Sequence, residues 1–492
     1  MKALMIQGTA SGVGKSVLVA GLCRLLARNG VRVAPFKPQN MSNNAAVTID
    51  GGEIGRAQAL QALACGIEPT VHMNPVLIKP EGDEKAQLVV RGKVVGSLEA
   101  RRFREDRIGW MQMVLDSFAI LQAQYDVVIV EGAGSPAEPN LREGDIANMG
   151  FAEAADVPVW LVGDIDCGGV FAALSGSLYI LSTSENGRVK ALLINRFRGN
   201  LALLDDALIW LEEKTGRPVA GVIPYLPLEL PEEDAPYRHQ NFVSSYLRGE
   251  NVLRIAVIAY PRMSNSDDID PLASEAGVQL RFVRSAEELS PADLIILPGS
   301  KHVASDLAWL RAAGFVPELE RHLRYGGKLL GLCGGMQMLG LSISDDAVDG
   351  ACVEGGAAGL AWLPVSTTMQ SDKILRQVDQ LSHRFGGHRV TGYEIHHGTS
   401  EGATTELFPF FACSDDKQVW GSYLHGLFEQ GAFRQSWLAE IFEFSGDGRD
   451  QQQRTLASLD LLADALEQAL DVELLSPLLA TANMAKQVNQ SS

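Results

Sequence analysis

Short apolar runs alternate with amphipathic stretches through the first 226 residues of the chain. The runs that predict β-strands are Ala3–Gln7, Val31–Phe36, Asp126–Val130, Val157–Val162, Ala191–Ile194 and Val219–Ile223. Several are separated by stretches of helical period, such as Lys15–Asn29, whose leucines fall on one helical face. Alternation of strand and helix in this way predicts a doubly wound, mostly parallel sheet.

A second pattern of the same kind begins at Leu253. Its predicted strands and helices are, in order, the strands Leu253–Ala259, Phe282–Arg284 and Leu294–Leu297, the helix Val303–Ala313, the strand Lys328–Leu332, the helix Met336–Leu341, and the strands Val390–Ile395 and Val419–Leu424. From Gln430 the pattern is helical, and the chain ends in the polar tail Gln487–Ser492. We therefore expect an α/β protein with two doubly wound, mostly parallel-sheet domains.

The segment Pro224–Glu250 interrupts the alternation. It contains several prolines and the acidic run Glu232-Glu233-Asp234, and a new α/β pattern starts directly after it. A long surface loop is the alternative, but the restart of the pattern favours an interdomain linker. The predicted organisation is a first domain at 1–226, a linker at 227–250, a second domain at 251–445, and a helical extension with a tail at 446–492.

Composition narrows the class of protein. A chain of 492 residues is too long for a single hydrophobic core. The net charge of −18 disfavours nucleic-acid binding, which needs a basic surface. The six cysteines are scattered without a CxxC pair, which indicates neither a disulfide framework nor a zinc site. Without a signal peptide or a run of about 20 uncharged apolar residues, we expect a cytoplasmic protein with no membrane span. Its oligomeric state is not predicted.

The segment Gly8-Thr9-Ala10-Ser11-Gly12-Val13-Gly14-Lys15-Ser16 lies between the first predicted strand and helix. A glycine-rich turn in that context exposes backbone N–H groups that bind phosphate oxygens. Lys15 would reach the terminal phosphates, and the Ser16 hydroxyl would ligate Mg²⁺. The residues expected to bind the nucleotide here are Gly8, Thr9, Gly12, Gly14, Lys15 and Ser16. The first glycine stands one position early, a variant similar to dethiobiotin synthetase and its relatives, which phosphorylate carboxyl-type groups.

Two further polar residues stand at predicted strand ends, where ligands bind in open α/β sheets. Glu131 is followed by a glycine turn and is a candidate Mg²⁺ ligand, directly or through water. A solvated acid at a strand end is the alternative. Asn195 ends another strand and could pair with the adenine edge or cap the next turn, and the sequence leaves these readings even.

The segment Gly331-Leu332-Cys333-Gly334-Gly335 follows an apolar strand and opens a helix. This pattern predicts a nucleophile elbow, in which a sharp turn lifts the thiol out of the sheet. The helix N-terminus favours the thiolate, the reactive form. The backbone N–H of Gly334 and the turn at Gly299 are the candidate oxyanion donors. A buried structural cysteine is the alternative, which we assign to the other five cysteines because they lack this context.

Cys333 needs a base, and His425 is the best placed by pattern because it follows the last predicted strand. His396 and His397 are competitors.

With these residues in place, the second half resembles the class I glutamine amidotransferase domain. Residues 1–440 resemble the cobyric acid synthase family, the cobalamin-pathway glutamine amidotransferases. The most specific segments are Pro35–Asn44, Asp50–Gln58, Gly144–Gly150 and Gly392–His396. The wider class commonly has His-x-Glu, whereas Leu427 stands in the glutamate position here, as in the cobyric and cobyrinic acid branch. What orients His425 is therefore left open, although Glu429 is nearby in sequence.

The resemblance implies that ATP with Mg²⁺ and glutamine drive amidation of the b, d, e and g carboxylates of (adenosyl)cobyrinic acid a,c-diamide, giving (adenosyl)cobyric acid. ATP would convert each carboxylate to an acyl phosphate. Ammonia released from glutamine at Cys333 would reach it through a passage that excludes solvent. Asp50 becomes a further candidate metal ligand. Lys37, in the cofactor site, and Asp145, as a catalytic residue, would position the reacting carboxylate. Alternatively Lys37 is a solvated loop charge and Asp145 a helix N-cap.

Two rival functions remain. One is the sister enzyme that makes the a,c-diamide, which the segment after the phosphate loop disfavours. The other is a P-loop regulatory ATPase fused to a glutamine-sensing domain, which needs no corrinoid.

Overall fold

The computed structural model describes residues 1–80, 85–99, 107–231, 242–243, 252–345, 357–402 and 411–489. The chain divides into two compact units, and both are assembled from separate stretches of sequence. The first comprises Met1–Ser42, Thr48–Leu230 and Thr455–Ser492, and the second comprises Asn43–Val47 and Pro231–Arg454. Each unit is described separately below.

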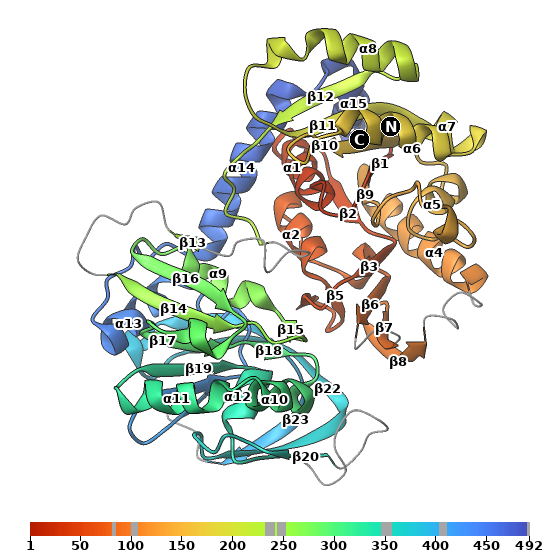
Figure 1. Ribbon diagram of the computed structural model, residues 1–492. Helices are drawn as coiled ribbons and strands as arrows, with labels where there is room; N and C mark the ends of the chain where they lie inside the picture. Colours follow the sequence, from red (N-terminus) through yellow and green to blue (C-terminus); the bar gives the residue numbers. More distant parts are fainter. Residues whose placement is uncertain are drawn as a thin grey trace. The chain divides into compact units, whose positions relative to one another are not determined.

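The first unit is built on a six-stranded sheet in the order β12-β11-β10-β1-β9-β2 (Figure 1). Its strands are β1 (Ala3–Gly8), β2 (Val33–Phe36), β9 (Val127–Glu131), β10 (Val159–Asp164), β11 (Val189–Phe197) and β12 (Val219–Pro224). Every neighbouring pair is parallel. The carboxyl ends of these strands therefore meet at one edge, where the candidate phosphate loop and Glu131 lie.

Helices cover both faces of this sheet, because successive side chains of each buried strand point to opposite faces. Met5 packs in one apolar core with helices α4 to α6, and Ile6 packs in another with α1. The helices of the unit are α1 (Lys15–Arg28), α2 (Arg56–Cys65), α4 (Arg107–Gln124), α5 (Met149–Ala154), α6 (Val170–Ile180), α7 (Thr183–Arg188) and α8 (Asp205–Thr215), with 3₁₀ turns at Val71–Met73, Pro139–Leu141 and Leu201–Leu203.

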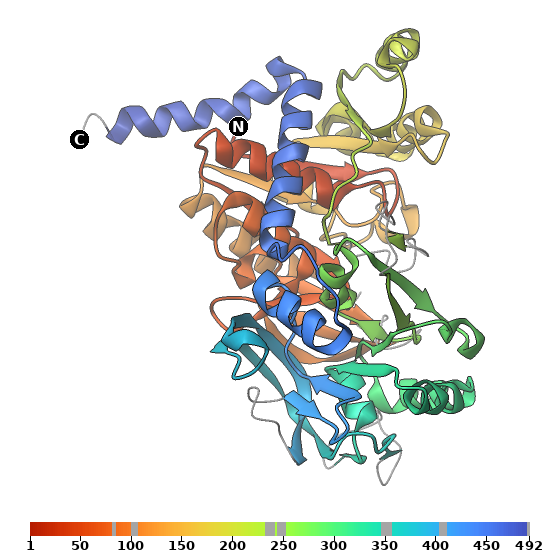
Figure 2. The ribbon, with the colours of Figure 1, turned by 90° about the vertical axis from the view of Figure 1, so that its left-hand side faces the viewer.

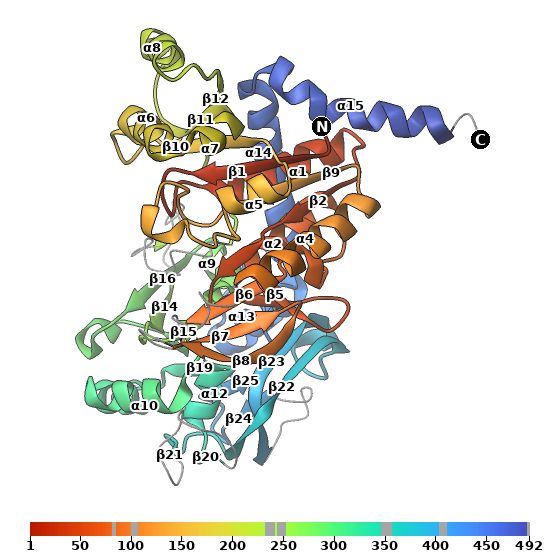
Figure 3. The same cartoon turned by 90° about the vertical axis from the view of Figure 1, so that its right-hand side faces the viewer.

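A smaller sheet in the order β3-β6-β7-β8 belongs to the same unit (Figure 3). Its strands are β3 (Gln39–Met41), β6 (Val76–Pro80), β7 (Lys85–Val90) and β8 (Lys93–Glu99), and a short strand β5 (Glu53–Gly55) precedes α2. The sequence analysis did not predict this sheet. Its strand β3 holds only three residues, too few to show a period, and so does β5, which lies outside this sheet.

The C-terminal helices are α14 (Gln451–Ala469) and α15 (Val472–Asn489). They follow the second unit in sequence, yet the chain from Thr455 belongs to the first unit. Figure 2 shows α14, in blue, running beside the red α1. A β-carbon on Gly21 would lie 2.5 Å from Leu466, so the helices approach closely. Arg24 donates to Asp460 at 2.7 Å beside this contact.

The second unit contains a seven-stranded sheet in the order β13-β16-β14-β17-β19-β25-β24. Its strands are β13 (Phe242–Val243), β14 (Leu253–Ile258), β16 (Val278–Val283), β17 (Leu294–Leu297), β19 (Lys328–Leu332), β24 (Phe411–Cys413) and β25 (Val419–Ser422). The five central strands are parallel, and the two edge strands pair antiparallel. One face packs with α9 and α13, and the other with α10, α11 and α12 (Figure 1).

The helices of this unit are α9 (Asp270–Ala273), α10 (Val303–Ala312), α11 (Phe315–Arg324), α12 (Gly334–Leu339) and α13 (Gly431–Phe442), with 3₁₀ turns at Ser266–Ile269, Ala286–Leu289 and Phe385–Gly387. A second sheet joins β20 (Ser342–Asp345), β21 (Ala357–Ala358), β22 (Val365–Leu381) and β23 (Arg389–Gly402). Two short strands, β15 (Met263–Ser264) and β18 (Gly299–Ser300), pair beside the main sheet. The remaining strand, β4, is Ala45–Val47.

The predicted fold class, two doubly wound and mostly parallel sheets, is confirmed. Apart from the smaller sheet and the strand β22, which were not predicted, the local differences concern boundaries. The predicted strand Phe282–Arg284 is only the end of β16, which begins at Val278. The predicted linker 227–250 is described only at 227–231 and 242–243, and its acidic run lies outside the described residues. Within the described chain, every helix is too short or too polar to span a bilayer.

Candidate active sites

The phosphate-loop segment joins β1 to α1, as its sequence predicts. Gly14 has φ of 96°, a left-handed conformation that favours glycine, and a β-carbon there would lie 2.3 Å from Nδ2 of Asn195. The Lys15 ammonium donates to the carbonyl oxygens of Ala10 and Gly134, both at 2.9 Å. The lysine therefore lies over the loop, close to the glycine turn that follows Glu131.

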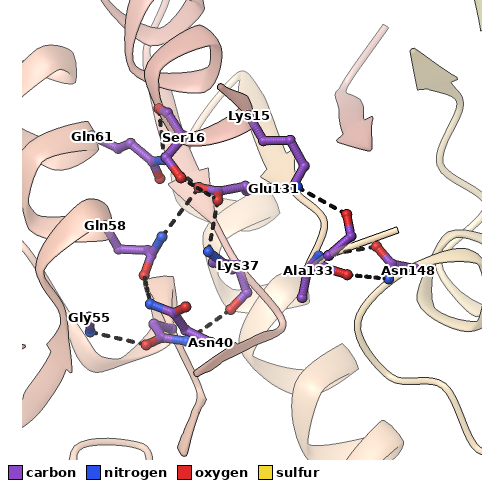
Figure 4. A network of polar contacts seen from close by, with 12 residues as sticks. Lys15, Ser16, Lys37, Asn40, Gly55, Gln58, Gln61, Glu131, Ala133 and Asn148 are labelled. Atoms are coloured by element: carbon purple, nitrogen blue, oxygen red, sulfur yellow. Dashed lines mark hydrogen bonds and ion pairs between the residues drawn. The ribbon is translucent and has the colours of Figure 1, made fainter. Parts of the chain in front are cut away.

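Glu131, at the end of β9, is the centre of a buried polar network (Figure 4). Its Oε1 accepts hydrogen bonds from the Ser16 hydroxyl and the Lys37 ammonium, each at 2.7 Å. Its Oε2 accepts from Gln61 at 2.6 Å and from Gln58 at 3.4 Å. The network joins the phosphate loop to the segments after β2 and in α2.

Electrostatics keep this carboxylate charged. Burial acts to raise the pKa of Glu131, but the nearby Lys37 charge and the hydrogen bonds from Lys37, Ser16 and Gln61 outweigh it, and the pKa lies below its ordinary value. A charged carboxylate and a hydroxyl whose oxygens are 2.7 Å apart are the hard oxygen donors that Mg²⁺ prefers. Ser16 and Glu131 are therefore residues that could hold a magnesium ion.

Asn195 contacts the loop itself, at the end of β11. Its Nδ2 donates to the carbonyl oxygen of Val13 at 2.8 Å, which ties the strand end to the phosphate loop. The structure thus places Asn195 beside the nucleotide site, and the prediction that it pairs with adenine stays a prediction.

Asp145 lies at the start of the turn before α5. Its Oδ1 accepts from the backbone N–H groups of Ala147 and Asn148, and its Oδ2 accepts from Gly150 at 2.9 Å. These bonds shape the turn that precedes α5, whose N-cap residue is Asn148 and not Asp145. Asn148 in turn accepts from Ala133 N at 3.1 Å, so this turn contacts the glycine turn after Glu131. The role of Asp145 at the reacting carboxylate stays a prediction.

Asp50 lies in an exposed turn, where Thr48 donates a short hydrogen bond to its carboxylate. None of the contacts described for Glu131 involves it. In the part of the chain that the structure describes, no three His, Cys, Asp or Glu side chains converge into a metal cluster. The role of Asp50 as a magnesium ligand therefore stays a prediction.

Cys333 stands at the carboxyl end of β19, directly before α12. Its φ of 50° and ψ of −109° are a strained conformation for a residue with a β-carbon. A β-carbon on Gly334 would lie 2.8 Å from the Ser300 nitrogen, and one on Gly335 would lie 1.9 Å from the Leu297 oxygen. The two glycines are therefore required for the turn, as expected of a nucleophile elbow. The contact also places the Gly334 backbone beside the turn at Gly299, the two predicted oxyanion donors.

His425 follows β25 and is buried. Its Nδ1 lies 2.6 Å from Oδ2 of Asp268, whose Oδ1 accepts from Gly426 N at 2.9 Å. Burial acts to lower the pKa of His425, but the Asp268 charge and hydrogen bond, with a further contribution from Cys333, outweigh burial and raise it to about 10. Asp268 thus fixes both the ring orientation and the tautomer, with the proton on Nδ1 and Nε2 left for other contacts.

Sequence reasoning missed Asp268, which lies in the 3₁₀ turn Ser266–Ile269. The only local signal was the acidic pair Asp267-Asp268 after a predicted strand, and no rule of spacing links it to a histidine 157 residues later. Glu429, considered from sequence, has its carboxyl group near Gly426. The carboxylate that contacts the His425 imidazole nitrogen belongs to Asp268, not to Glu429.

The two competing histidines have other contacts. His396 is buried, stacks on Tyr423 with ring centroids 3.8 Å apart, and has its Nδ1 3.1 Å from the Gly398 oxygen. His397 has its Nδ1 3.3 Å from the Gln370 oxygen. Cys333 contributes to the pKa of His425 through a hydrogen bond, which favours His425 as its partner.

Two family models match the chain, one in each half. Residues 4–237 match the model of the CobQ/CobB/MinD/ParA nucleotide binding domain, and residues 254–433 match that of the CobB/CobQ-like glutamine amidotransferase domain. A cobyric acid synthase of Halorhodospira halophila is 60% identical over 96% of this chain and 96% of its own. The chain belongs to the cobyric acid synthase family. Another member, from Vibrio vulnificus strain CMCP6, is 50% identical over 95% of this chain and 98% of its own.

Solved structures are more distant from this member of the cobyric acid synthase family. One described as a glutamine amidotransferase is 16% identical, with a TM-score of 0.29, covering 39% of this chain and 99% of its own. The MinD cell division protein of Aquifex aeolicus is 15% identical, with a TM-score of 0.27, covering 46% of this chain and 83% of its own. The family assignment rests on the sequence relatives alone.

Proposed function

We propose that the chain uses ATP and glutamine to amidate the b, d, e and g carboxylates of (adenosyl)cobyrinic acid a,c-diamide, giving (adenosyl)cobyric acid in the cytoplasm. The observation that carries this proposal is the 60% identity, over 96% of both chains, to a protein named cobyric acid synthase. The two sites described above supply the two kinds of chemistry that the reaction needs.

In the second unit, the Cys333 sulfur attacks the side-chain carbonyl carbon of glutamine. The Gly334 N–H and the turn at Gly299 donate to the oxyanion that forms. His425 then gives a proton from Nε2 to the departing nitrogen, so the C–N bond breaks and ammonia leaves. The thioester left on Cys333 is hydrolysed when His425 takes a proton from water, and glutamate is released. Asp268 holds the imidazole in position for both proton transfers.

In the first unit, the backbone N–H groups from Gly8 to Gly14 and the Lys15 ammonium bind the phosphates. Ser16 and Glu131 hold the magnesium ion. When bound, ATP with Mg²⁺ supplies a phosphoryl group that turns the unreactive substrate carboxylate into an electrophile. Lys37 holds Glu131 in place and places a positive charge beside the transferring group. Unprotonated ammonia is needed there, because ammonium has no lone pair with which to attack.

The direct test is to incubate the protein with ATP, Mg²⁺, glutamine and cobyrinic acid a,c-diamide and to follow the corrinoid by mass spectrometry. We expect four successive amidations, each accompanied by one glutamate. A parallel incubation replaces the a,c-diamide with cobyrinic acid. Amidation of cobyrinic acid at positions a and c alone, with the a,c-diamide left unchanged, would contradict the proposal and identify the sister activity. An ATP hydrolysis rate that is the same with and without the corrinoid, with no amide product, would instead support a regulatory ATPase.

The Asp268→Asn variant tests the arrangement around His425. Without the carboxylate, burial dominates and the pKa of His425 falls from its raised value of about 10. We expect kcat for glutamine hydrolysis to fall by roughly 10² to 10⁴-fold, since the tautomer is no longer fixed. Because the imidazolium persists in the native protein until the pH approaches 10, the alkaline limb of kcat/KM should move to lower pH in the variant.

The measurement is glutamate release between pH 6 and pH 10, with Asp267→Asn as the matched control because it removes the adjacent carboxylate. A native alkaline limb in Asp268→Asn, with kcat within a few-fold of the native value, would show that another group orients His425.

A further inference from the structure

A short piece of the N-terminal half is built into the second unit. Asn43–Val47 belongs to that unit, whereas the residues before and after it belong to the first. Asn44 and the strand β4 that follows it are buried. The chain therefore leaves the synthetase unit for this segment and returns to it at Thr48.

Two hydrogen bonds tie this segment to residues that surround His425. The Asn44 side-chain oxygen accepts from the backbone N–H of Asn265 at 2.8 Å. The carbonyl oxygen of Ala45 accepts from the Tyr393 hydroxyl at 2.9 Å. Both bonds are buried, where a missing partner is costly.

Tyr393 and Asn265 each contact His425 directly. The Tyr393 ring is stacked on the imidazole with centroids 5.2 Å apart, and the two residues exchange both backbone hydrogen bonds, at 3.1 and 2.9 Å. Asn265 has its Nδ2 3.1 Å from His425 Nδ1. These two residues therefore frame the catalytic imidazole from separate elements.

Asn265 also sets the position of Asp268. It has φ of 51° and ψ of 50°, the left-handed region that costs energy for any residue with a β-carbon, and it begins the 3₁₀ turn that carries Asp268. The Asn44 side chain accepts from the backbone N–H of Asn265 and so helps to hold Asn265 in this conformation. A shift of Asn44 would therefore act on Asp268 as well as on the imidazole.

The other end of the same stretch of chain is bonded into the nucleotide site. Lys37 donates to Glu131 at 2.7 Å, and Asn40 donates to Gln58, which in turn donates to Glu131. Asn44 follows Asn40 by four residues. One continuous stretch, 37–47, is thus anchored on Glu131 at its start and on the neighbours of His425 at its end.

We propose that Asn43–Val47 is a positioning segment through which occupation of the nucleotide site sets the geometry of His425 and Asp268. A ligand that draws Lys37 from Glu131, or Asn40 from Gln58, shifts the chain that leads to Asn44 and Ala45, and so moves the neighbours of the imidazole. Glutamine is hydrolysed fastest when the acceptor is ready, and ammonia is not wasted. The inference rests on the proposed function, and it adds the residues that link the two reactions.

The test compares glutamate release with and without ATP, Mg²⁺ and the a,c-diamide. In the native protein we expect stimulation of about 5-fold or more, the usual range for coupled sites. Tyr393→Phe keeps the ring stacked on His425 but removes the hydroxyl that bonds Ala45, and it should lower the stimulation at least about 3-fold. Asn44→Ala should lower it likewise. The effect is expected in kcat, with KM for glutamine unchanged, because the segment acts on the imidazole.

Tyr325→Phe, at an exposed tyrosine of the same unit, is the control and should keep the native stimulation. If Asn44→Ala does not fold, Tyr393→Phe decides alone. Stimulation of Tyr393→Phe to the same extent as the native protein would overturn the proposal. So would a native protein that amidates the corrinoid but releases glutamate at the same rate with and without ATP and corrinoid. Failure of the proposed function would appear differently, as the absence of amide product in the native protein.

Discussion

Replacement of Cys333 by alanine should abolish amidation with glutamine while sparing amidation with added ammonia. The sulfur is the only atom of the elbow that can form the thioester, so we expect glutamate release to fall by on the order of 10⁴-fold or more. The substitution fits the site, since alanine keeps the β-carbon at the strained position and removes only the sulfur. Glutamate and amide products should be measured in the same samples, with each nitrogen source.

Cys413→Ala is the matched control for this experiment. Cys413 is a buried thiol of β24 in the same unit, and burial raises its pKa to about 11, so it is an unreactive core residue. The control should keep both activities. Loss of ammonia-dependent amidation in a folded Cys333→Ala protein would contradict the separation of the two reactions.

Replacement of Lys15 by alanine should remove amidation with either nitrogen source, unlike Cys333→Ala, which should lose only amidation with glutamine. The ammonium lies over the phosphate loop, where it donates to the carbonyl oxygens of Ala10 and Gly134, and we propose that its charge stabilises the transferring phosphoryl group. Loss of one such group lowers the rate by roughly 10² to 10³-fold. The measurement is amide product and ADP at saturating ammonia, which bypasses the glutamine site.

An exposed lysine of the same unit, Lys190, provides the control for loss of one positive charge. Lys190→Ala should amidate at the native rate. Ammonia-supported amidation at the native rate in Lys15→Ala would show that the loop does not serve the reaction. Basal glutamate release should survive in Lys15→Ala, since the Cys333 site is intact.

The parts of this protein that were predictable from sequence are those with a period or a sharp local rule. Buried parallel strands such as Leu294–Leu297 and Lys328–Leu332 appear as continuous apolar runs, and the structure has the same bounds. The phosphate loop and the cysteine elbow are local turns whose glycines can be read directly. Glu131 could be singled out as a candidate because ligands bind at strand ends in parallel sheets, and its role as a magnesium ligand stays a prediction.

The parts that were missed depend on tertiary contacts. Asp268 reaches His425 only because the turn after β15 folds back to the end of β25, and sequence distance says nothing about that approach. The three backbone partners of Asp145 depend on the turn before α5, which the sequence did not reveal. The segment Asn43–Val47 looked like part of a single domain, although its contacts place it in the other unit.

The return of α14 to the first unit has a consequence for the way this protein is made. Leu459, Leu462 and Leu466 are fully or almost fully buried in the same core as Leu18 and Leu22 of α1. During synthesis on a ribosome, α1 emerges early, whereas its partner helix α14 is translated only after the second unit. The N-terminal unit therefore cannot complete its apolar core before the glutamine-hydrolysing unit has been synthesised. We expect newly made chains to complete the first unit, and with it the phosphate-loop site, only after α14 has been synthesised.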